Sequence, residues 1–222
     1  MSLPSTGQEP RWRRLPEERP RQLIDAALEV FGEHGLAGAR LEDIAKRAGV
    51  SKGTIYLYFP NKEALFREMV RQKVIEEIEA AEQRLTDGTA TEQLRRFMLG
   101  YWTFLRSPAF ATIYRLVHGE LHHFPDLAKF YSREVIERGI KLVGEIIRRG
   151  ARSGEFRDID PTVAARMLGS IMLSHAVWCS RRSFFLHVAE ETDEQCVDNI
   201  IDFYLHALRP DQTGAGAGTS RT

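Results

Sequence analysis

Apolar residues recur every three to four positions along almost the whole chain, which is the spacing of one helix face. No stretch alternates apolar and polar residues as a half-buried strand does. Breaker pairs such as Asp87-Gly88, Ser107-Pro108 and Asp160-Pro161 divide the pattern. It predicts about nine helices, near residues 20–34, 41–48, 52–58, 61–86, 90–106, 109–122, 126–152, 161–181 and 192–208. We therefore expect an all-α protein.

The second and third predicted helices have the features of a helix-turn-helix. Leu41, Ile44 and Ala45 give the first of them one apolar face. Gly49 stands where that helix must stop, because glycine adopts positive φ without strain, and Ser51 can cap the next helix with its hydroxyl. In this motif two helices cross steeply and the second lies in the DNA major groove.

The helix at residues 52–58 is unusual for a solvated surface. With Ile55 facing inward, a rotation of about 100° per residue places the outward and flanking positions at Lys52, Gly53, Thr54, Tyr56 and Leu57. A glycine inside a helix costs roughly 1 kcal/mol relative to alanine. A helix that must approach a duplex closely explains both the glycine and the exposed apolar residues.

Lys62 lies in the first turn of the following helix, which Asn61 can cap. A cation at this position opposes the helix dipole. An anion held by the backbone N–H groups and the ammonium would remove that penalty, and a DNA phosphate is such an anion. The alternative is a solvated surface lysine, an interpretation that the neighbouring helix disfavours.

Two runs of sequence resemble the DNA-binding segment of the TetR family of bacterial transcriptional regulators: RQLIDAALEVFGEHG (21–35) and DIAKRAGVSKGTIYLYFPNKEAL (43–65). The resemblance implies that Thr54, Tyr56 and Lys62 contact phosphates and that Lys52, Gly53 and Leu57 face base edges. Where the family usually has Thr or Ser before the first motif helix, this chain has Arg40, which can reach a phosphate but puts the cap in doubt. The candidate DNA-binding residues are Arg40, Ser51, Lys52, Gly53, Thr54, Tyr56, Leu57, Tyr58 and Lys62.

The predicted organisation has a basic leader (1–19), a three-helix DNA-binding domain (20–66), a larger helical domain for ligand binding and dimerisation (67–209) and a flexible tail (210–222). The leader, basic around Arg11, Arg13 and Arg14, is either disordered or an arm that touches the minor groove or phosphates.

Composition changes this picture little. Of 222 residues 43% are hydrophobic, enough for a sizeable core, and Lys+Arg and Asp+Glu both number 31. Residues 1–73 carry a net +3 charge and the remainder −3, consistent with a DNA-facing N-terminal end. Cys179 and Cys196 form no CxxC pattern, so reduced thiols are expected.

No targeting or membrane-spanning segment is expected. The first residues lack the apolar stretch of a signal peptide, and the longest apolar run, 167–179, is too short to span a bilayer. The sequence therefore predicts a soluble cytoplasmic protein.

Large rings are frequent after residue 87. The stripe Leu94, Phe97, Met98, Tyr101 and Leu105 already completes one buried face of the 90–106 helix, so Trp102 is additional apolar surface. Most rings are core and interface residues. The resemblance implies a small-molecule pocket between these helices, for an apolar or aromatic effector. The candidate lining residues are Trp102, Tyr114, His118, His122 and Trp178.

His118 and His122, at positions i and i+4, share a helix face and could bind a metal together with Asp126. The spacing is not HExxH, and three well-placed ligands are not evident, so a polar helix end or pocket wall is the alternative. No Ser-His-Asp or Cys-His arrangement stands out. We expect no metal, no cofactor and no catalytic residue.

The last two predicted helices carry apolar residues on more than one face, which indicates contact with a second subunit. The candidate interface residues are Met167, Ile171, Ser174, Val197, Ile201 and Tyr204. The favoured hypothesis is a ligand-responsive homodimeric repressor that binds a roughly palindromic operator. The alternatives are an architectural or recruitment factor without a ligand, and an enzyme that uses the region 118–123.

Overall fold

The computed structural model describes residues 18–84, 87–185 and 190–210, and these contain helices and no strand. The elements are α1 (Glu18–Gly38), α2 (Leu41–Arg47), α3 (Lys52–Tyr58), α4 (Lys62–Val70), α5 (Glu76–Arg84), α6 (Ala90–Leu105), α7 (Pro108–Gly119), α8 (Pro125–Tyr131), α9 (Arg138–Ser153), α10 (Pro161–Ser180) and α11 (Asp193–Ala207). Two π-helical turns, Arg71–Ile75 and Ser132–Glu137, make α4–α5 and α8–α9 continuous, and Leu121–His123 is a 3-10 turn. Within these ranges there are nine continuous helices, so the all-α prediction is confirmed.

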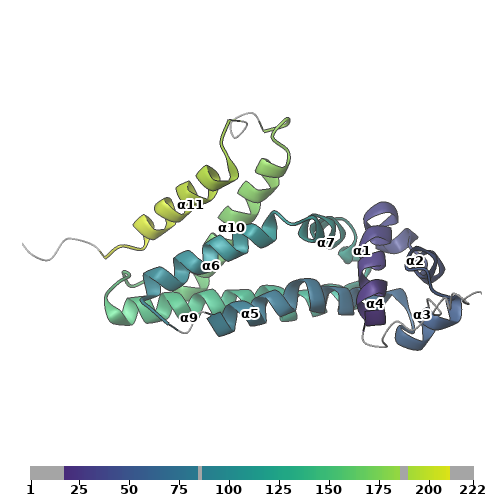
Figure 1. Cartoon of the computed structure of the whole chain (residues 1–222). Coiled ribbons are helices and arrows are strands. Elements are labelled where there is room, and N and C mark those ends of the chain that lie inside the picture. Colours follow the sequence, from purple (N-terminus) through teal and green to yellow (C-terminus); the bar gives the residue numbers. More distant parts are fainter. Residues whose placement is uncertain (1–17, 85–86, 186–189, 211–222) are drawn as a thin grey trace, which may run out of the picture.

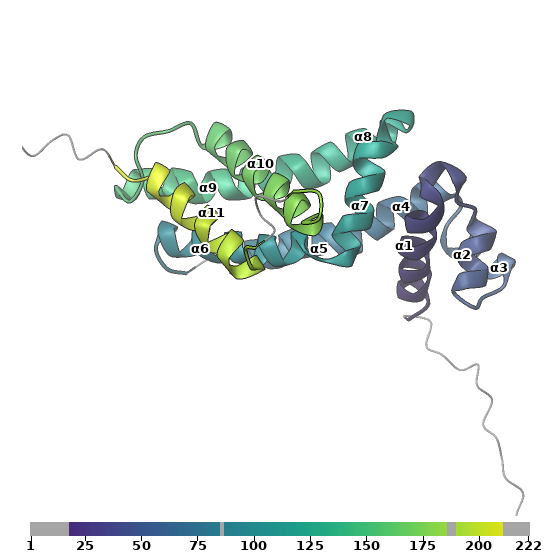
Figure 2. The same ribbon diagram turned by 90° about the horizontal axis from the view of Figure 1, so that it is seen from above.

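The molecule is elongated (Figure 1). Helices α1–α4 form one end, α5, α6 and α9–α11 form the other, and α7 lies between them. Figure 2, which looks from above, shows that α8 and α9 run back along the length of the molecule, where α8 contacts α4 and α9 contacts α5. The predicted leader and most of the predicted tail lie outside the described residues.

The helix boundaries follow the local signals in the sequence. Ser51 caps α3 by accepting from Thr54 N, and Asn61 caps α4 by accepting from Ala64 N at 2.7 Å. Gly35 interrupts α1 with φ 70°, and Gly49 ends the α2 turn with φ 67°. Arg40 occupies the N-cap position of α2 and makes no side-chain cap, as the departure from Thr or Ser led us to expect.

Two clusters of buried apolar side chains hold the fold together. The N-terminal core lies among α1–α4, and it also takes in Ile113 and Leu116 of α7, Leu121, and Leu127 of α8. The C-terminal core lies among α6, α9, α10 and α11. The first core therefore continues beyond residue 66, where the sequence places the end of the DNA-binding domain, and that division stays a prediction.

The helix that begins at Lys62 runs between the two cores and is interrupted by the π-helical turn at Arg71–Ile75. Lys73 Nζ lies 2.7 Å from Asp25 Oδ1, which ties the turn to α1. Arg138 bridges Glu79 and Glu82 at 3.0 and 2.6 Å, which ties α5 to the start of α9. No helix in the described ranges has the length and apolar character needed to cross a membrane.

Candidate nucleic-acid interface

Helices α2 and α3 meet through small and branched residues, as the sequence predicts. Ile55 is fully buried, and Ile44 and Ala45 of α2 belong to the same core. The turn is closed by Val50 N, which donates to Ala45 O at 2.9 Å. The close approach of the two helices fixes the direction in which the opposite face of α3 points.

That opposite face of α3 is open to solvent. Leu57 is 84% exposed and Tyr56 45% exposed, and Lys52 and Gly53 are exposed beside them. Thr54 is half-buried, and its hydroxyl lies 2.8 Å from that of Ser51. Large apolar side chains on a short polar helix indicate a surface that meets a partner.

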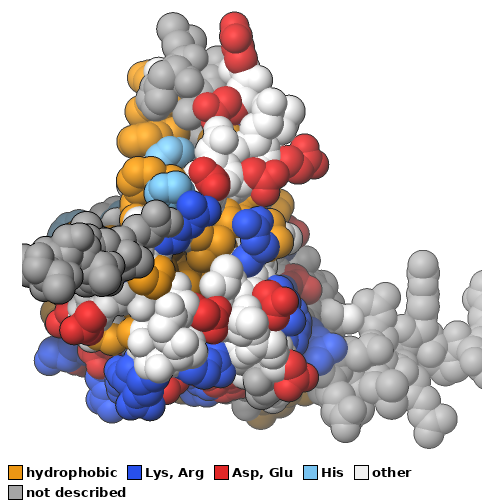
Figure 3. Space-filling model, turned by 90° about the vertical axis from the view of Figure 1, so that its left-hand side faces the viewer, with side chains coloured by type: hydrophobic (Ala, Val, Ile, Leu, Met, Phe, Trp, Pro, Cys, Tyr) orange, Lys and Arg blue, Asp and Glu red, His pale blue; other side chains and the backbone are white. Residues whose placement is uncertain are grey.

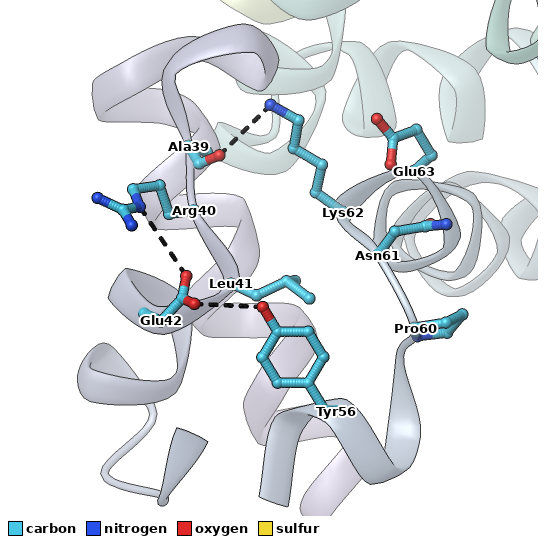
Figure 4. A pocket seen from close by; sticks show the side chains of 9 residues that line it. All are labelled: Ala39, Arg40, Leu41, Glu42, Tyr56, Pro60, Asn61, Lys62 and Glu63. Atoms are coloured by element: carbon cyan, nitrogen blue, oxygen red, sulfur yellow. Dashed lines mark hydrogen bonds and ion pairs between the residues drawn. The ribbon is translucent and has the colours of Figure 1, made fainter. Parts of the chain in front are cut away.

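A shallow hollow lies where α2, α3 and the start of α4 converge (Figure 4). Its lining residues are Ala39, Arg40, Leu41, Glu42, Tyr56, Pro60, Asn61, Lys62 and Glu63. Backbone N–H groups at the start of α4 and the cationic side chains of Arg40 and Lys62 give the hollow donors for an anion.

The Lys62 ammonium is held in place within this hollow. Its Nζ donates to Ala37 O at 2.7 Å. It also lies 3.4 Å from Ala39 O, a contact that Figure 4 shows. The N–H of Ala37 donates in turn to Glu120 Oε2 at 2.9 Å, so the end of α7 holds the same peptide segment. Lys62 is therefore not a freely solvated lysine, and two of its three N–H donors are used within the protein.

Glu42 is a member of this surface that sequence reasoning did not single out. Its Oε1 lies 2.9 Å from Lys52 Nζ and accepts from Tyr56 Oη at 3.2 Å. The hydrogen bond from Lys52 is the main reason why the pKa of Glu42 is lowered to about 2. In the sequence Glu42 looks like an ordinary acidic residue in a first helical turn, and only the packing of α2 on α3 brings Lys52 to it.

Known families match this chain over most of its length. Residues 23–69 match the family described as bacterial regulatory proteins, tetR family, and residues 92–210 match the AefR-like transcriptional repressor C-terminal domain. The chain belongs to the TetR family. The helix-turn-helix described above is thus the DNA-binding segment of a TetR-family transcriptional regulator.

Individual relatives agree with this assignment. The fatty acid metabolism regulator protein of Bacillus subtilis (strain 168) is 30% identical over 169 residues, which are 74% of this chain and 86% of that protein. The fatty acid degradation regulator FadR of Bacillus halodurans has a structure that aligns with a TM-score of 0.69 at 26% identity, covering 87% of this chain and 96% of that one. FadR of Bacillus subtilis in complex with stearoyl-CoA aligns with a TM-score of 0.68 at 24% identity, covering 85% and 99%.

The five predicted ligand residues of this TetR-family chain do not converge. His118 and His122 are exposed, and Tyr114 is half-buried with its ring centroid 4.2 Å from that of His118. Trp102 lies in the C-terminal core, and Trp178 is near the end of α10 beside His175. Where the structure is described, no three His, Cys, Asp or Glu side chains are grouped to hold a metal.

Three other polar groups, which the sequence did not reveal, lie in buried or partly buried positions on α6 and α8. Trp102 Nε1 is buried and has no hydrogen-bond partner among the described residues. Burial raises the pKa of Tyr101 to about 12. Burial also raises the pKa of Tyr131, and the nearby Tyr101 adds a smaller upward shift. The sequence assigned Tyr101 to a core stripe, and nothing in it indicated that Tyr131 lies close to Tyr101.

The structure corrects half of the predicted dimer residues. Val197, Ile201 and Tyr204 are at most 5% exposed and belong to the chain's own C-terminal core, where Tyr204 Oη also donates to Ala164 O at 2.6 Å. Met167 (57% exposed) does face solvent; Ser174 is also exposed and Ile171 is half-buried. On α11 the exposed ring is Phe203, at 64%.

Proposed function

We propose that this chain is a homodimeric repressor that binds a roughly palindromic operator through α3 and is released by a small molecule with a long apolar group. The observation that carries the DNA-binding part is the exposed face of α3, where Tyr56 and Leu57 stand beside Lys52. Such a face fits the major groove, where a recognition helix contacts base edges.

Phosphate and base contacts fall to different residues in this proposal. Lys62 and Tyr56 border the hollow at the start of α4 and contact phosphates, which position the protein without reading sequence. Lys52 and Leu57 are exposed on α3, do not line the hollow, and contact base edges, which specify the operator. Arg40, whose side chain is 74% exposed, is free to reach a phosphate beyond them.

The dimer interface is proposed to lie on the exposed faces of α10 and α11. Met167 and Phe203 are large apolar side chains that the chain's own core leaves in solvent. Figure 3 shows hydrophobic side chains on one side of the upper part of the molecule, with acidic side chains on the other. An apolar face of two helices is completed by its symmetry mate in a four-helix interface.

The effector is proposed to enter the interior near α6 and α8. Trp102 Nε1 and the hydroxyls of Tyr101 and Tyr131 are polar groups in apolar surroundings, which is how ligand sites orient one polar end of an otherwise apolar ligand. The related regulators from the two Bacillus species are named for fatty acid metabolism and degradation. A long-chain fatty acyl compound is therefore the effector class that we propose.

The two sites are coupled through α7 in this proposal. Glu120 at the end of α7 accepts from Ala37 N, and the carbonyl of Ala37 accepts from Lys62. Arg115 Nη2 also donates to Gly32 O of α1 at 3.1 Å. A ligand that binds the conformation without DNA more tightly shifts the population towards it, and a coupling of about 1–3 kcal/mol lowers operator affinity by roughly 5- to 150-fold.

The test combines DNA binding with ligand titration. DNA flanking the gene is assayed for binding at several salt concentrations, and long-chain acyl compounds are then titrated into the complex. If each protomer neutralises about four phosphates, log K should fall with log[salt] with a slope on the order of −7. Lys62→Ala should weaken all duplexes alike, and tight binding by that variant at every salt concentration would contradict the phosphate assignment.

A further inference from the structure

Glu42 has no role in holding phosphates, because its negative charge repels them, yet it lies on the surface proposed for DNA binding (Figure 4). Its carboxylate is held from three directions. Lys52 Nζ and Tyr56 Oη contact Oε1 at 2.9 and 3.2 Å, and Arg40 Nε lies 3.9 Å from Oε2. The position of this carboxylate is therefore set before any DNA arrives.

The contact between Lys52 and Glu42 places one hydrogen-bond donor beside one acceptor, 2.9 Å apart. In the major groove a G·C pair presents guanine O6, an acceptor, beside cytosine N4, a donor. These two base atoms are joined by the hydrogen bond of the base pair, whose usual length is about 2.9 Å. The ammonium and the carboxylate thus have the same spacing as the two groups that they would meet.

We propose that Lys52 and Glu42 together read one base pair in each half-site, with Lys52 donating to a base oxygen and Glu42 accepting from the amino group of the partner base. A G·C pair meets this requirement, and guanine N7 offers Lys52 a second acceptor. A T·A pair meets it less well, because thymine lacks that second acceptor. The inverted pairs C·G and A·T place an amino group against the ammonium and an oxygen against the carboxylate.

The wrong orientation is unfavourable because Glu42 cannot act as a donor. Its pKa is lowered to about 2, chiefly by the hydrogen bond from Lys52, so the group is ionised at neutral pH and only accepts hydrogen bonds. An acceptor held against a base oxygen is left unpaired and repelled. Before DNA binds, Tyr56 also holds the carboxylate in place, since its hydroxyl donates to the same oxygen.

The inference rests on the proposed function, and its test starts from a pool of random-sequence duplexes selected with the wild-type protein and with two variants, Glu42→Gln and Lys52→Met. The matched controls are Asp43→Asn and Lys46→Met, which make the same changes at exposed positions of α2. The sites selected by the wild type and by both controls should have a G·C pair at one position in each half-site. Both variants should lose the preference at that same position.

Affinities for single duplexes make the test quantitative. Inverting that G·C pair should weaken wild-type binding on the order of 5- to 150-fold, the discrimination expected of one good pair of base contacts. The same inversion should change binding by Glu42→Gln or Lys52→Met by less than about 3-fold, well below that range. If a thermal unfolding control shows that Glu42→Gln does not fold, Lys52→Met alone decides the test. Its binding should then also be nearly insensitive to inversion of the G·C pair.

Two results would overturn the inference. In one, no position of the selected wild-type sites distinguishes a base pair from its inversion. In the other, the two variants alter preferences at different positions, so that the residues act separately. A wild-type pool with no enriched sequence at all would instead overturn the proposed function, which keeps the two failures distinguishable.

Discussion

The two ends of this protein differ in how many of their functional groups already have contacts within the chain. On the proposed DNA-binding surface beside the N-terminal core, the polar side chains are already held within the protein: Lys62 by backbone carbonyls, and Glu42 by Lys52 and Tyr56. The C-terminal core leaves Trp102 Nε1 without a partner among the described residues and leaves large side chains such as Phe203 in solvent.

This difference matches what each end is proposed to meet. Duplex DNA has a nearly constant backbone geometry, so a surface that binds it benefits from side chains fixed in advance. An effector and a second subunit supply the missing contacts of the other end only when they bind. The following predictions test this contrast, in order of decreasing effect on stability.

The largest effect is expected from Phe66→Ala in the N-terminal core. Phe66 is fully buried and packs edge-on against Phe31, with ring centroids 6.4 Å apart. Removing a buried ring costs about 3–5 kcal/mol of unfolding free energy. Urea unfolding measures this, and a loss below about 1 kcal/mol would mean that the core is not packed as described.

A smaller effect is expected at the start of α6, where Glu155 accepts from Ala90 N at 3.0 Å and from Thr91 N at 2.9 Å. Burial alone would raise the pKa of Glu155, but the backbone hydrogen bonds from Thr91 and Ala90 outweigh it and lower the pKa to about 2. Glu155→Gln should cost about 1.5–3 kcal/mol at neutral pH, as for a hydrogen bond to a charged group.

The pH dependence of that contribution has a definite sign. Because the folded-state pKa is depressed, the stabilisation is present above the unfolded value near 4.5 and is lost as pH falls towards 2. Thermal unfolding of the wild type and Glu155→Gln should therefore differ most above pH 5 and converge at low pH. A difference that stays constant between pH 6 and pH 2 would contradict the assignment.

Glu120→Ala tests the connection between the two ends. The variant removes the acceptor of Ala37 N, at a net cost of about 1 kcal/mol. It should also weaken operator binding and reduce the effect of ligand on it, because Lys62 is held by the same peptide segment. Glu120→Gln, which keeps an acceptor oxygen, should restore both, and unaltered ligand coupling in Glu120→Ala would exclude α7 as the route.

The smallest effect on stability is expected from Phe203→Ser on α11. Phe203 is 64% exposed, so the unfolding free energy of the monomer should change by less than about 0.5 kcal/mol. The dimer should nevertheless dissociate at higher concentration, as analytical ultracentrifugation would show. The control is Ile201→Ser, which should destabilise the fold itself, because Ile201 is fully buried in the chain's own core.

The sequence by itself determined the elements and their ends. Helix periodicity, the caps at Ser51 and Asn61 and the breaks at Gly35 and Gly49 are local, since each depends on residues within about one turn of the chain. The exposed face of α3 could be predicted as well, because one inward residue, Ile55, fixes the direction of every other position on so short a helix.

Only the tertiary structure decided which partner each face meets. An apolar stripe has the same sequence pattern whether it packs against its own chain or against a second copy. Ile201 and Tyr204 were therefore predicted as interface residues, but they are core residues. Glu42 and Glu120 likewise gained their roles from neighbours that are 10 and 83 residues away, Lys52 and Ala37. Such contacts depend on how helices pack, and the spacing of residues along one helix does not specify that packing.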